Sequence, residues 1–245
     1  MSSETAASPH TKVAIITGAS GGIGAALVTA YRRLGYAVVA TDRSIGDSAD
    51  PYTLAARVDL TDPGAGARIV QTAMDRFGRV DTVVNSAGIY LEKPFTQYTD
   101  EDFDLIVGVN LRGFFTVSRS AVGAMLARRN AGGGGHVVNI STSLVDHART
   151  QAPSALASLT KGGLNAVTRS LAIEYAAHGI RVNTVSLGVI RTPMNPDATP
   201  ELIARHPLGR MGEVGDVIGA VTYLETAPFV TGEVLHVDGG QSAGH

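Results

Sequence analysis

The chain has no cysteine, no long apolar run and no excess of charge of one sign, and each absence narrows its function. Without a thiol among its 245 residues, disulfides, thiolate nucleophiles and thiolate metal sites are excluded. No apolar run approaches the ~20 residues that cross a bilayer. The formal net charge of −2 gives no electrostatic argument for nucleic acid or an anionic membrane as partner. We therefore expect a small-molecule substrate, and a cytoplasmic location by default.

Short β-rich runs alternate with longer helical patterns from end to end, which predicts an α/β fold built of βαβ units around a parallel sheet. We expect residues 1–11 to be a disordered tail and residues 12–245 to be one domain. Polar residues and prolines gather between positions 191 and 207, which predicts a mobile lid over a site. Strands are expected at 12–17, 36–41, 55–58, 80–85, 136–140, 180–185 and 233–237. Helices are expected at 22–34, 63–77, 100–129 (capped by Asp100) and 154–177 (capped by Ser154), with a turn at 132–135.

A glycine-rich segment, residues 17–24, lies between the first expected strand and the first expected helix. Gly18 permits a tight turn, Gly22 lets the backbone approach a pyrophosphate, and Gly24 lets the helix pack closely on the strand. The helix then presents its free N–H groups and positive dipole end to the phosphates. Because an acidic residue, Asp42, also ends the second strand, the segment predicts a dinucleotide-binding site.

Two neighbouring residues give opposite indications about the dinucleotide. Asp42 can accept hydrogen bonds from both ribose hydroxyls of NAD, and its charge repels a 2′-phosphate. The guanidinium of Arg43 could pair with that phosphate instead. We favour NAD(H) and keep NADP(H) as possible.

With these residues in view, almost the whole chain resembles the short-chain dehydrogenase/reductases. The resemblance rests on Thr17-Gly18-(x)3-Gly22-x-Gly24, Val58-Asp59-Leu60, Asn85-Ser86-Ala87-Gly88, Val109-Asn110, Asn139-Ile140-Ser141-Thr142, Ile180-Arg181-Val182-Asn183 and Val237-Asp238-Gly239-Gly240. It implies a Rossmann-type, doubly wound sheet of seven parallel strands in a three-layer sandwich, assembled as a homotetramer or a homodimer. The cofactor-binding residues that it implies are Gly18, Ser20, Gly22, Ile23, Gly24, Asp42, Arg43, Asp59, Leu60, Asn85, Ala87, Gly88, Lys161, Gly188, Ile190 and Thr192.

The same resemblance exposes a departure at the catalytic centre. The family carries a tyrosine four residues before a lysine, and that tyrosine gives a proton to the substrate oxygen. Here Lys161 is in place but Ala157 occupies the tyrosine position, and no tyrosine occurs between Tyr98 and Tyr175. The position of the catalytic serine falls on Thr142. The catalytic residues implied are therefore Asn110, Thr142 and Lys161.

Loss of the acid leaves three interpretations open, because general acid catalysis typically contributes about 10²- to 10⁴-fold. The first is a substitute acid, such as Tyr90 or His147, in an enzyme that reduces ketones. The second is a substrate such as a protonated imine, which needs no donated proton. The third is a dinucleotide-binding protein that senses or scaffolds without catalysis. The candidates for the substrate pocket are Tyr90, Ser143, His147, Ala157 and Met194. The seven histidines are scattered, and we predict no metal site.

Overall fold

The computed structural model describes residues 11–128 and 134–244, and within them seven parallel strands form one sheet in the order β3-β2-β1-β4-β5-β6-β9. The order reverses between β1 and β4, so the carboxyl ends of these two strands flank a crevice where ligands bind in such sheets. The seven strands are β1 (Val13–Thr17), β2 (Ala37–Asp42), β3 (Thr53–Arg57), β4 (Thr82–Asn85), β5 (Gly135–Thr142), β6 (Ile180–Leu187) and β9 (Val234–Val237).

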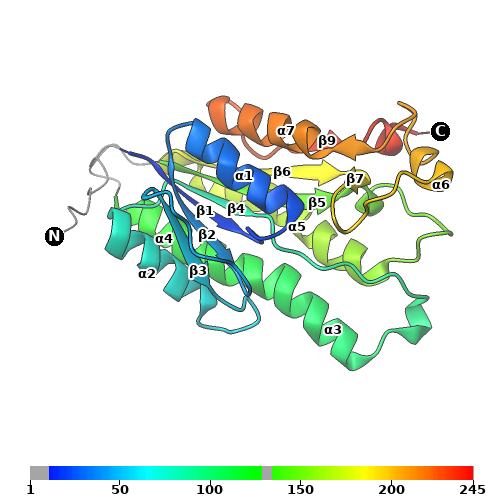
Figure 1. The fold of residues 1–245 in the computed structure, drawn as a ribbon, viewed down its shortest axis with the longest axis horizontal. Coiled ribbons are helices and arrows are strands. Elements are labelled where there is room, and N and C mark those ends of the chain that lie inside the picture. The colour runs from blue at the N-terminus through cyan, green and yellow to red at the C-terminus, as the bar shows by residue number, and fades with distance from the viewer. Residues whose placement is uncertain (1–10, 129–133, 245) are drawn as a thin grey trace.

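Helices cover both faces of the sheet and make three layers (Figure 1). Helices α1 and α7 pack on one face, and α2, α4 and α5 pack on the other. Because both faces are covered, central strands such as β1 read as continuous apolar runs rather than as an alternating pattern. The helices are α1 (Gly22–Arg33), α2 (Ala65–Phe77), α3 (Asp100–Val107), α4 (Phe114–Ala127), α5 (Ala155–Tyr175), α6 (Pro200–Ile203) and α7 (Val214–Thr226).

The predicted doubly wound parallel sheet in three layers is confirmed, and the differences are local. The expected helix over 100–129 is divided by a π-helical segment, Gly108–Gly113, between α3 and α4. Thr99, and not Asp100, caps α3, because the Thr99 hydroxyl accepts from the Asp102 amide in a capping box. Ser154 does precede α5, but its side chain makes no capping hydrogen bond. The expected tail lies, apart from residue 11, outside the described residues, as does part of the expected turn at 132–135.

Four elements between β6 and β9 were not expected. Helix α7 and the short helix α6 both lie there, and β7 (Ile190–Arg191) pairs with β8 (Gly212–Glu213) in a separate two-stranded sheet. The pairing of β7 with β8 closes the segment that contains α6 into a loop at the carboxyl edge of the main sheet. This loop corresponds to the predicted lid.

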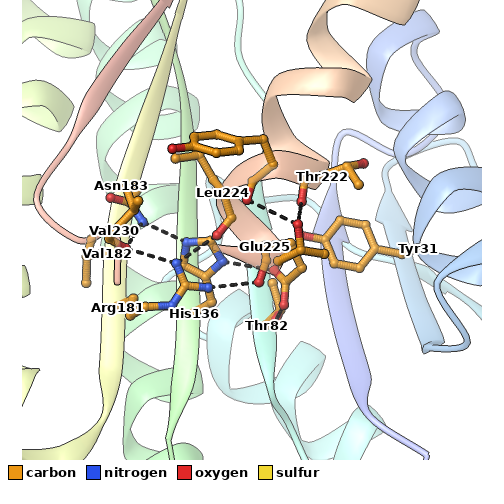
Figure 2. Close-up of polar contacts among 12 residues, drawn as sticks. Tyr31, Thr82, His136, Arg181, Val182, Asn183, Thr222, Leu224, Glu225 and Val230 are labelled. Atoms are coloured by element: carbon orange, nitrogen blue, oxygen red, sulfur yellow. Dashed lines mark hydrogen bonds and ion pairs between the residues drawn. The ribbon is translucent and has the colours of Figure 1, made fainter. Parts of the chain in front are cut away.

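A buried carboxylate joins α7 to residues near the amino ends of the strands (Figure 2). Glu225 on α7 accepts hydrogen bonds from the hydroxyls of Tyr31 at 2.9 Å, Tyr36 at 2.6 Å and Thr82 at 3.0 Å, and it lies 2.9 Å from Nδ1 of His136. Its side chain is only 6% exposed. Burial disfavours the charge, but the donors around the carboxylate hold the pKa of Glu225 below its usual range.

The tautomer of His136 follows from its other neighbour. Asn183 accepts a hydrogen bond on Oδ1 from the Glu233 amide at 3.1 Å, which fixes the orientation of its side-chain amide. Its Nδ2 therefore faces Nε2 of His136 at 3.0 Å, and that ring nitrogen must accept. The proton of the neutral imidazole then lies on Nδ1 and is donated to Glu225. This network lies away from the carboxyl edge of the sheet and serves to hold α7.

Candidate active site

The turn after β1 has the close backbone approaches that the glycines predicted. Gly18 has a φ of +69°, and a Cβ there would lie 2.8 Å from the Cα of Ala87. A Cβ on Gly24 would lie 2.0 Å from the carbonyl oxygen of Gly18, so only glycine lets α1 start this close to the strand. Gly21 precedes α1 without a side-chain cap, which leaves the first amides of the helix, at Gly22 and Ile23, free to bind an anion. The residues present thus fit a pyrophosphate.

Asp42, the last residue of β2, is tied to this turn. Its Oδ2 accepts from the amide of Ser20 at 3.4 Å, and its Oδ1 accepts from the amide of Arg43 at 2.7 Å. Asp42 is half-buried and Arg43 is exposed. The carboxylate is therefore held at the edge of the cradle, whereas the guanidinium extends into solvent.

The turn after β3 carries the expected Asp59 and Leu60. Oδ1 of Asp59 accepts from the amide of Thr61 at 2.9 Å and from its hydroxyl at 2.7 Å, and these bonds lower the pKa of Asp59. Leu60 is buried at 9% exposure and contacts the π-helical segment at Gly113. The turn is therefore braced against the element that carries Asn110.

The turn after β4 is held from below by side chains. The Thr17 hydroxyl accepts from the amide of Ala87 at 3.1 Å. Asn85 is 4% exposed, and its Nδ2 donates to Ser118 and to Asn139, both at 2.9 Å. The structure thus directs the amide nitrogen of Asn85 into the protein and leaves the backbone of the turn to face the crevice.

Asn110 and Lys161 converge on Gly88. A Cβ on Gly88 would lie 2.9 Å from Nζ of Lys161 and 3.5 Å from Oδ1 of Asn110. Asn110 lies in the π-helical segment, where it accepts from the Ile89 amide at 2.9 Å and donates to the Ile89 carbonyl at 3.1 Å. A π-helical turn is a frequent feature of functional sites. Here the side chain of Asn110 bonds both the amide and the carbonyl of Ile89.

Lys161 is held by one hydrogen bond, from Nζ to the carbonyl oxygen of Ile140 at 2.8 Å. Burial lowers the pKa of the Lys161 ammonium from 10.5 to about 8. One helical turn earlier, Ala157 is 3% exposed. The cluster thus combines a cation of perturbed pKa with a methyl group where the resemblance would place the acid.

Hydroxyl groups line the end of β5. Thr142, its last residue, accepts from the Leu144 amide at 3.3 Å, which leaves the proton of its hydroxyl available for donation. Ser141 donates instead to the backbone carbonyl of Lys161 at 3.3 Å, and Ser143 is 1% exposed. Of these three, Thr142 is the least committed and the best placed to contact a ligand.

The other candidates for the substrate pocket lie in loops. The Tyr90 hydroxyl donates to the Glu92 carboxylate at 2.9 Å, and burial together with that carboxylate raises the pKa of Tyr90. The amide of His147 donates to the carbonyl of Ser143 at 2.9 Å. Met194 is 67% exposed. The hydroxyl of Tyr90 is thus directed to Glu92, and the side chain of Met194 is largely exposed.

The predicted lid lies over the phosphate cradle. A Cβ on Gly22 would lie 3.0 Å from Cδ of Pro193 and 3.3 Å from Cβ of Thr192. The Gly188 amide donates to the Val237 carbonyl at 3.1 Å, and Ile190 is 5% exposed. Gly188, Ile190 and Thr192 therefore form a continuous wall that runs from the end of β6 to the cradle.

One residue at this edge was missed by sequence reasoning. His206, between α6 and β8, is 3% exposed and contacts the backbone at Gly188. The sequence shows only a histidine before a proline, and no spacing or pattern distinguishes it from the other scattered histidines.

In residues 11–128 and 134–244, no group of three His, Cys, Asp or Glu side chains is arranged to hold a metal ion. None of the helices in that part of the chain is both long and apolar enough to span a membrane.

Comparison with known proteins identifies the family. A family profile described as enoyl-(acyl carrier protein) reductase matches residues 18–242. The chain is 33% identical over 248 residues to the 3-oxoacyl-[acyl-carrier-protein] reductase of Thermotoga maritima. The alignment covers 94% of this chain and 97% of the relative.

Solved structures agree with the sequence relatives. The 3-ketoacyl-(acyl-carrier-protein) reductase of Brucella melitensis complexed with NADH superposes with a TM-score of 0.85 at 31% identity, over 96% of this chain and 100% of the other. A blue fluorescent protein from a metagenomic library, in complex with NADPH, gives 0.82 at 32% identity over 94% and 98%. The matches and the shared fold show that this chain belongs to the short-chain dehydrogenase/reductase family of NAD(P)-dependent oxidoreductases.

Proposed function

We propose that this chain reduces a small organic substrate with a C=N bond, using a nicotinamide dinucleotide. One observation carries the proposal: Lys161 and Asn110 converge on Gly88, whereas the position one turn before Lys161 is Ala157 and offers no proton. When bound, the nicotinamide ring supplies a hydride. A protonated imine that accepts a hydride on carbon becomes a neutral amine and needs no second proton, whereas a ketone oxygen must receive one.

The side chains of the site would bind and orient the reactants. The amides at the start of α1 would hold the pyrophosphate, and Asp42 would accept from the ribose hydroxyls, which favours NAD(H) over NADP(H). The Lys161 ammonium would hold the ribose of the nicotinamide half, and the Thr142 hydroxyl would contact the substrate. Ala157 supplies only a methyl group beside the reacting bond.

Carbonyl reduction is the second candidate, because the 3-oxoacyl and 3-ketoacyl reductases among the similar proteins are named for carbonyl substrates. It requires a substitute acid. Tyr90 is disfavoured for this role, because its hydroxyl already donates to Glu92 and its pKa is raised. His147 stays a candidate beside the end of β5.

The test is consumption of NADH and of NADPH by the purified protein with paired cyclic imines and ketones of matched shape. Imine turnover at least about 10²-fold above that of the matched ketone is expected from the absence of the acid. Equal turnover of ketones would refute the proposal, and loss of that turnover in Tyr90→Phe or His147→Ala would identify the acid. Binding of NADH without turnover of either substrate would favour the non-catalytic interpretation.

Assembly as a homotetramer or a homodimer is part of the proposal. Phe115 on α4, and Leu159 and Ile173 on α5, are 54%, 57% and 81% exposed. Apolar side chains this exposed on two long helices favour a subunit interface there. The mass of the particle in solution, from light scattering, tests this. A monomer would contradict it.

A further inference from the structure

His206 is a buried histidine whose protonation state is set by its neighbours. Its Nε2 lies 3.0 Å from the amide nitrogen of Val189, in the turn that follows β6. Its Nδ1 lies 3.0 Å from the carbonyl oxygen of Leu202 in α6. An amide only donates and a carbonyl only accepts, so Nε2 accepts and Nδ1 carries the proton. The ring is therefore neutral, and each nitrogen has one backbone partner.

The imidazole of His206 packs between segments that are far apart in the sequence. A Cβ on Gly188 would lie 2.7 Å from Nε2, and a Cβ on Gly239 would lie 3.1 Å from the Cβ of His206. The amide of Leu208 donates to the carbonyl of Gly239 at 3.0 Å, which pins the end of the lid to the turn after β9. His206 thus lies where the turns after β6 and β9 meet the lid.

The two groups that His206 bonds belong to different parts of the candidate site. Val189 lies between Gly188 and Ile190, two residues that the family resemblance assigns to cofactor binding. Leu202 lies in α6, within the lid that crosses the phosphate cradle at Gly22. The imidazole is the side chain that joins the two through hydrogen bonds at both ends.

We propose that His206 is a positioning residue that couples the lid to the wall at Gly188–Ile190, and that it does so only as the neutral imidazole. This inference rests on the proposed function for its consequence in cofactor binding, but not for the coupling itself. A proton on Nε2 would place two N–H groups against each other and break the bond to Val189.

The charges around the ring are compatible with a neutral state. Burial lowers the pKa of His206, and the nearby guanidinium of Arg149 acts in the same direction. Arg149 comes from the loop after β5 and donates to the carbonyl of Arg205 at 3.0 Å. Asp238 opposes the shift, but its carboxylate already accepts from the amides of Gly240 and Ser242.

Three variants separate the two hydrogen bonds. His206→Gln keeps an acceptor near the position of Nε2 and so retains the bond to Val189. His206→Asn keeps a donor near the position of Nδ1 and so retains only the bond to Leu202. His206→Leu keeps neither. His178→Gln, at the opposite edge of the sheet beyond α5, is the matched control.

The first measurement is amide hydrogen exchange of the full chain without cofactor. In His206→Asn, peptides from 189 to 204 should exchange about fivefold faster than in the wild type, since one hydrogen bond is worth about 1 kcal/mol, and in His206→Leu, which loses both bonds, they should exchange faster still. His206→Gln, which loses the bond to Leu202, should show a similar acceleration, whereas His178→Gln should resemble the wild type there. Unchanged exchange in either His206→Asn or His206→Gln overturns the coupling.

The second measurement is the dissociation constant of NADH and of NADPH, read from cofactor fluorescence across pH. The affinity of His206→Gln should not change as the pH falls, whereas the wild type should lose affinity as His206 is protonated at acid pH. Parallel pH profiles overturn the requirement for the neutral ring. If the wild type binds neither dinucleotide, the proposed function fails, whereas the exchange result still decides the coupling.

Discussion

Replacing Lys161 with methionine should make the protein more stable and abolish its turnover. Among the described residues no carboxylate pairs with Lys161, and its Nζ bonds a single backbone carbonyl. A buried ammonium without a carboxylate partner costs folding free energy, because a single carbonyl does not replace the water that burial removes. Methionine has a similar length and no charge, so it removes the cost while filling nearly the same space.

The magnitude follows from the pKa of Lys161, which burial lowers from 10.5 to about 8. A shift of about 2.5 pKa units corresponds to ~3 kcal/mol at most. The lost bond to Ile140 costs about 1 kcal/mol in return. Because Lys161 keeps partial contact with solvent, we expect a net gain near 2 kcal/mol at neutral pH, which raises Tm by about 4–8 °C for a chain of this length.

The sign of the pH dependence is fixed by the direction of the shift. Between pH 8 and 10.5 the unfolded chain binds the proton and the folded chain does not, so the wild type gains stability as pH rises through that window. The advantage of Lys161→Met should therefore be full at neutral pH and shrink by pH 10.

Thermal unfolding without dinucleotide, at pH 7 and at pH 10, is the assay. Lys93→Met is the control, because Lys93 pairs with Asp102 at 2.5 Å and its removal should bring no gain. If Lys161→Met melts at or below the wild-type temperature at both pH values, the assignment of Lys161 as an uncompensated buried cation is wrong.

Three further predictions concern the cradle and the core. Asp42→Ala should lower the preference for NADH over NADPH at least tenfold, because it removes a negative charge beside the ribose; an unchanged ratio of kcat/KM values would contradict this. Gly24→Ala should abolish dinucleotide binding, measured by fluorescence, since its Cβ would lie 2.0 Å from the Gly18 oxygen; wild-type affinity would refute the close approach. Glu225→Gln should lower the free energy of unfolding by about 3–5 kcal/mol in urea, because the two donors that share one carboxylate oxygen lose their acceptor; a loss below about 1 kcal/mol would show that the network rearranges.

The parts of the fold that the sequence predicted well are those with strong local patterns. The expected strand at 12–17 is β1 to within one residue, because five consecutive residues are buried on both faces and are all apolar or threonine. Gly18 was assigned to a tight turn and has a φ of +69°, and Gly24 was assigned to close packing of the helix on the strand and has it. Patterns of this kind are sufficient because sterics alone determine the outcome.

The parts that were missed depend on tertiary contacts. Helix α7 contains Gly215 and Gly219, which weaken helix propensity, and packing of Val217, Val221 and Leu224 on the sheet compensates. The π-helical segment leaves no signature in an otherwise helical pattern. His206 gains its role only where three loops meet. The local sequence pattern predicts none of these contacts.

The unpaired ammonium of Lys161 also bears on whether the site is used. A folded chain without a ligand gains about 2 kcal/mol by exchanging this residue for an apolar one, so the fold gives no reason to keep it. Cations of perturbed pKa that pair with no carboxylate of the protein are typical of functional sites, where a ligand can be the partner. Asn110 and Lys161 converge on Gly88 in the turn after β4, one of the two strands that flank the reversal of sheet order. The geometry therefore favours a site that still binds, and Ala157 changes what can react there rather than whether anything is held.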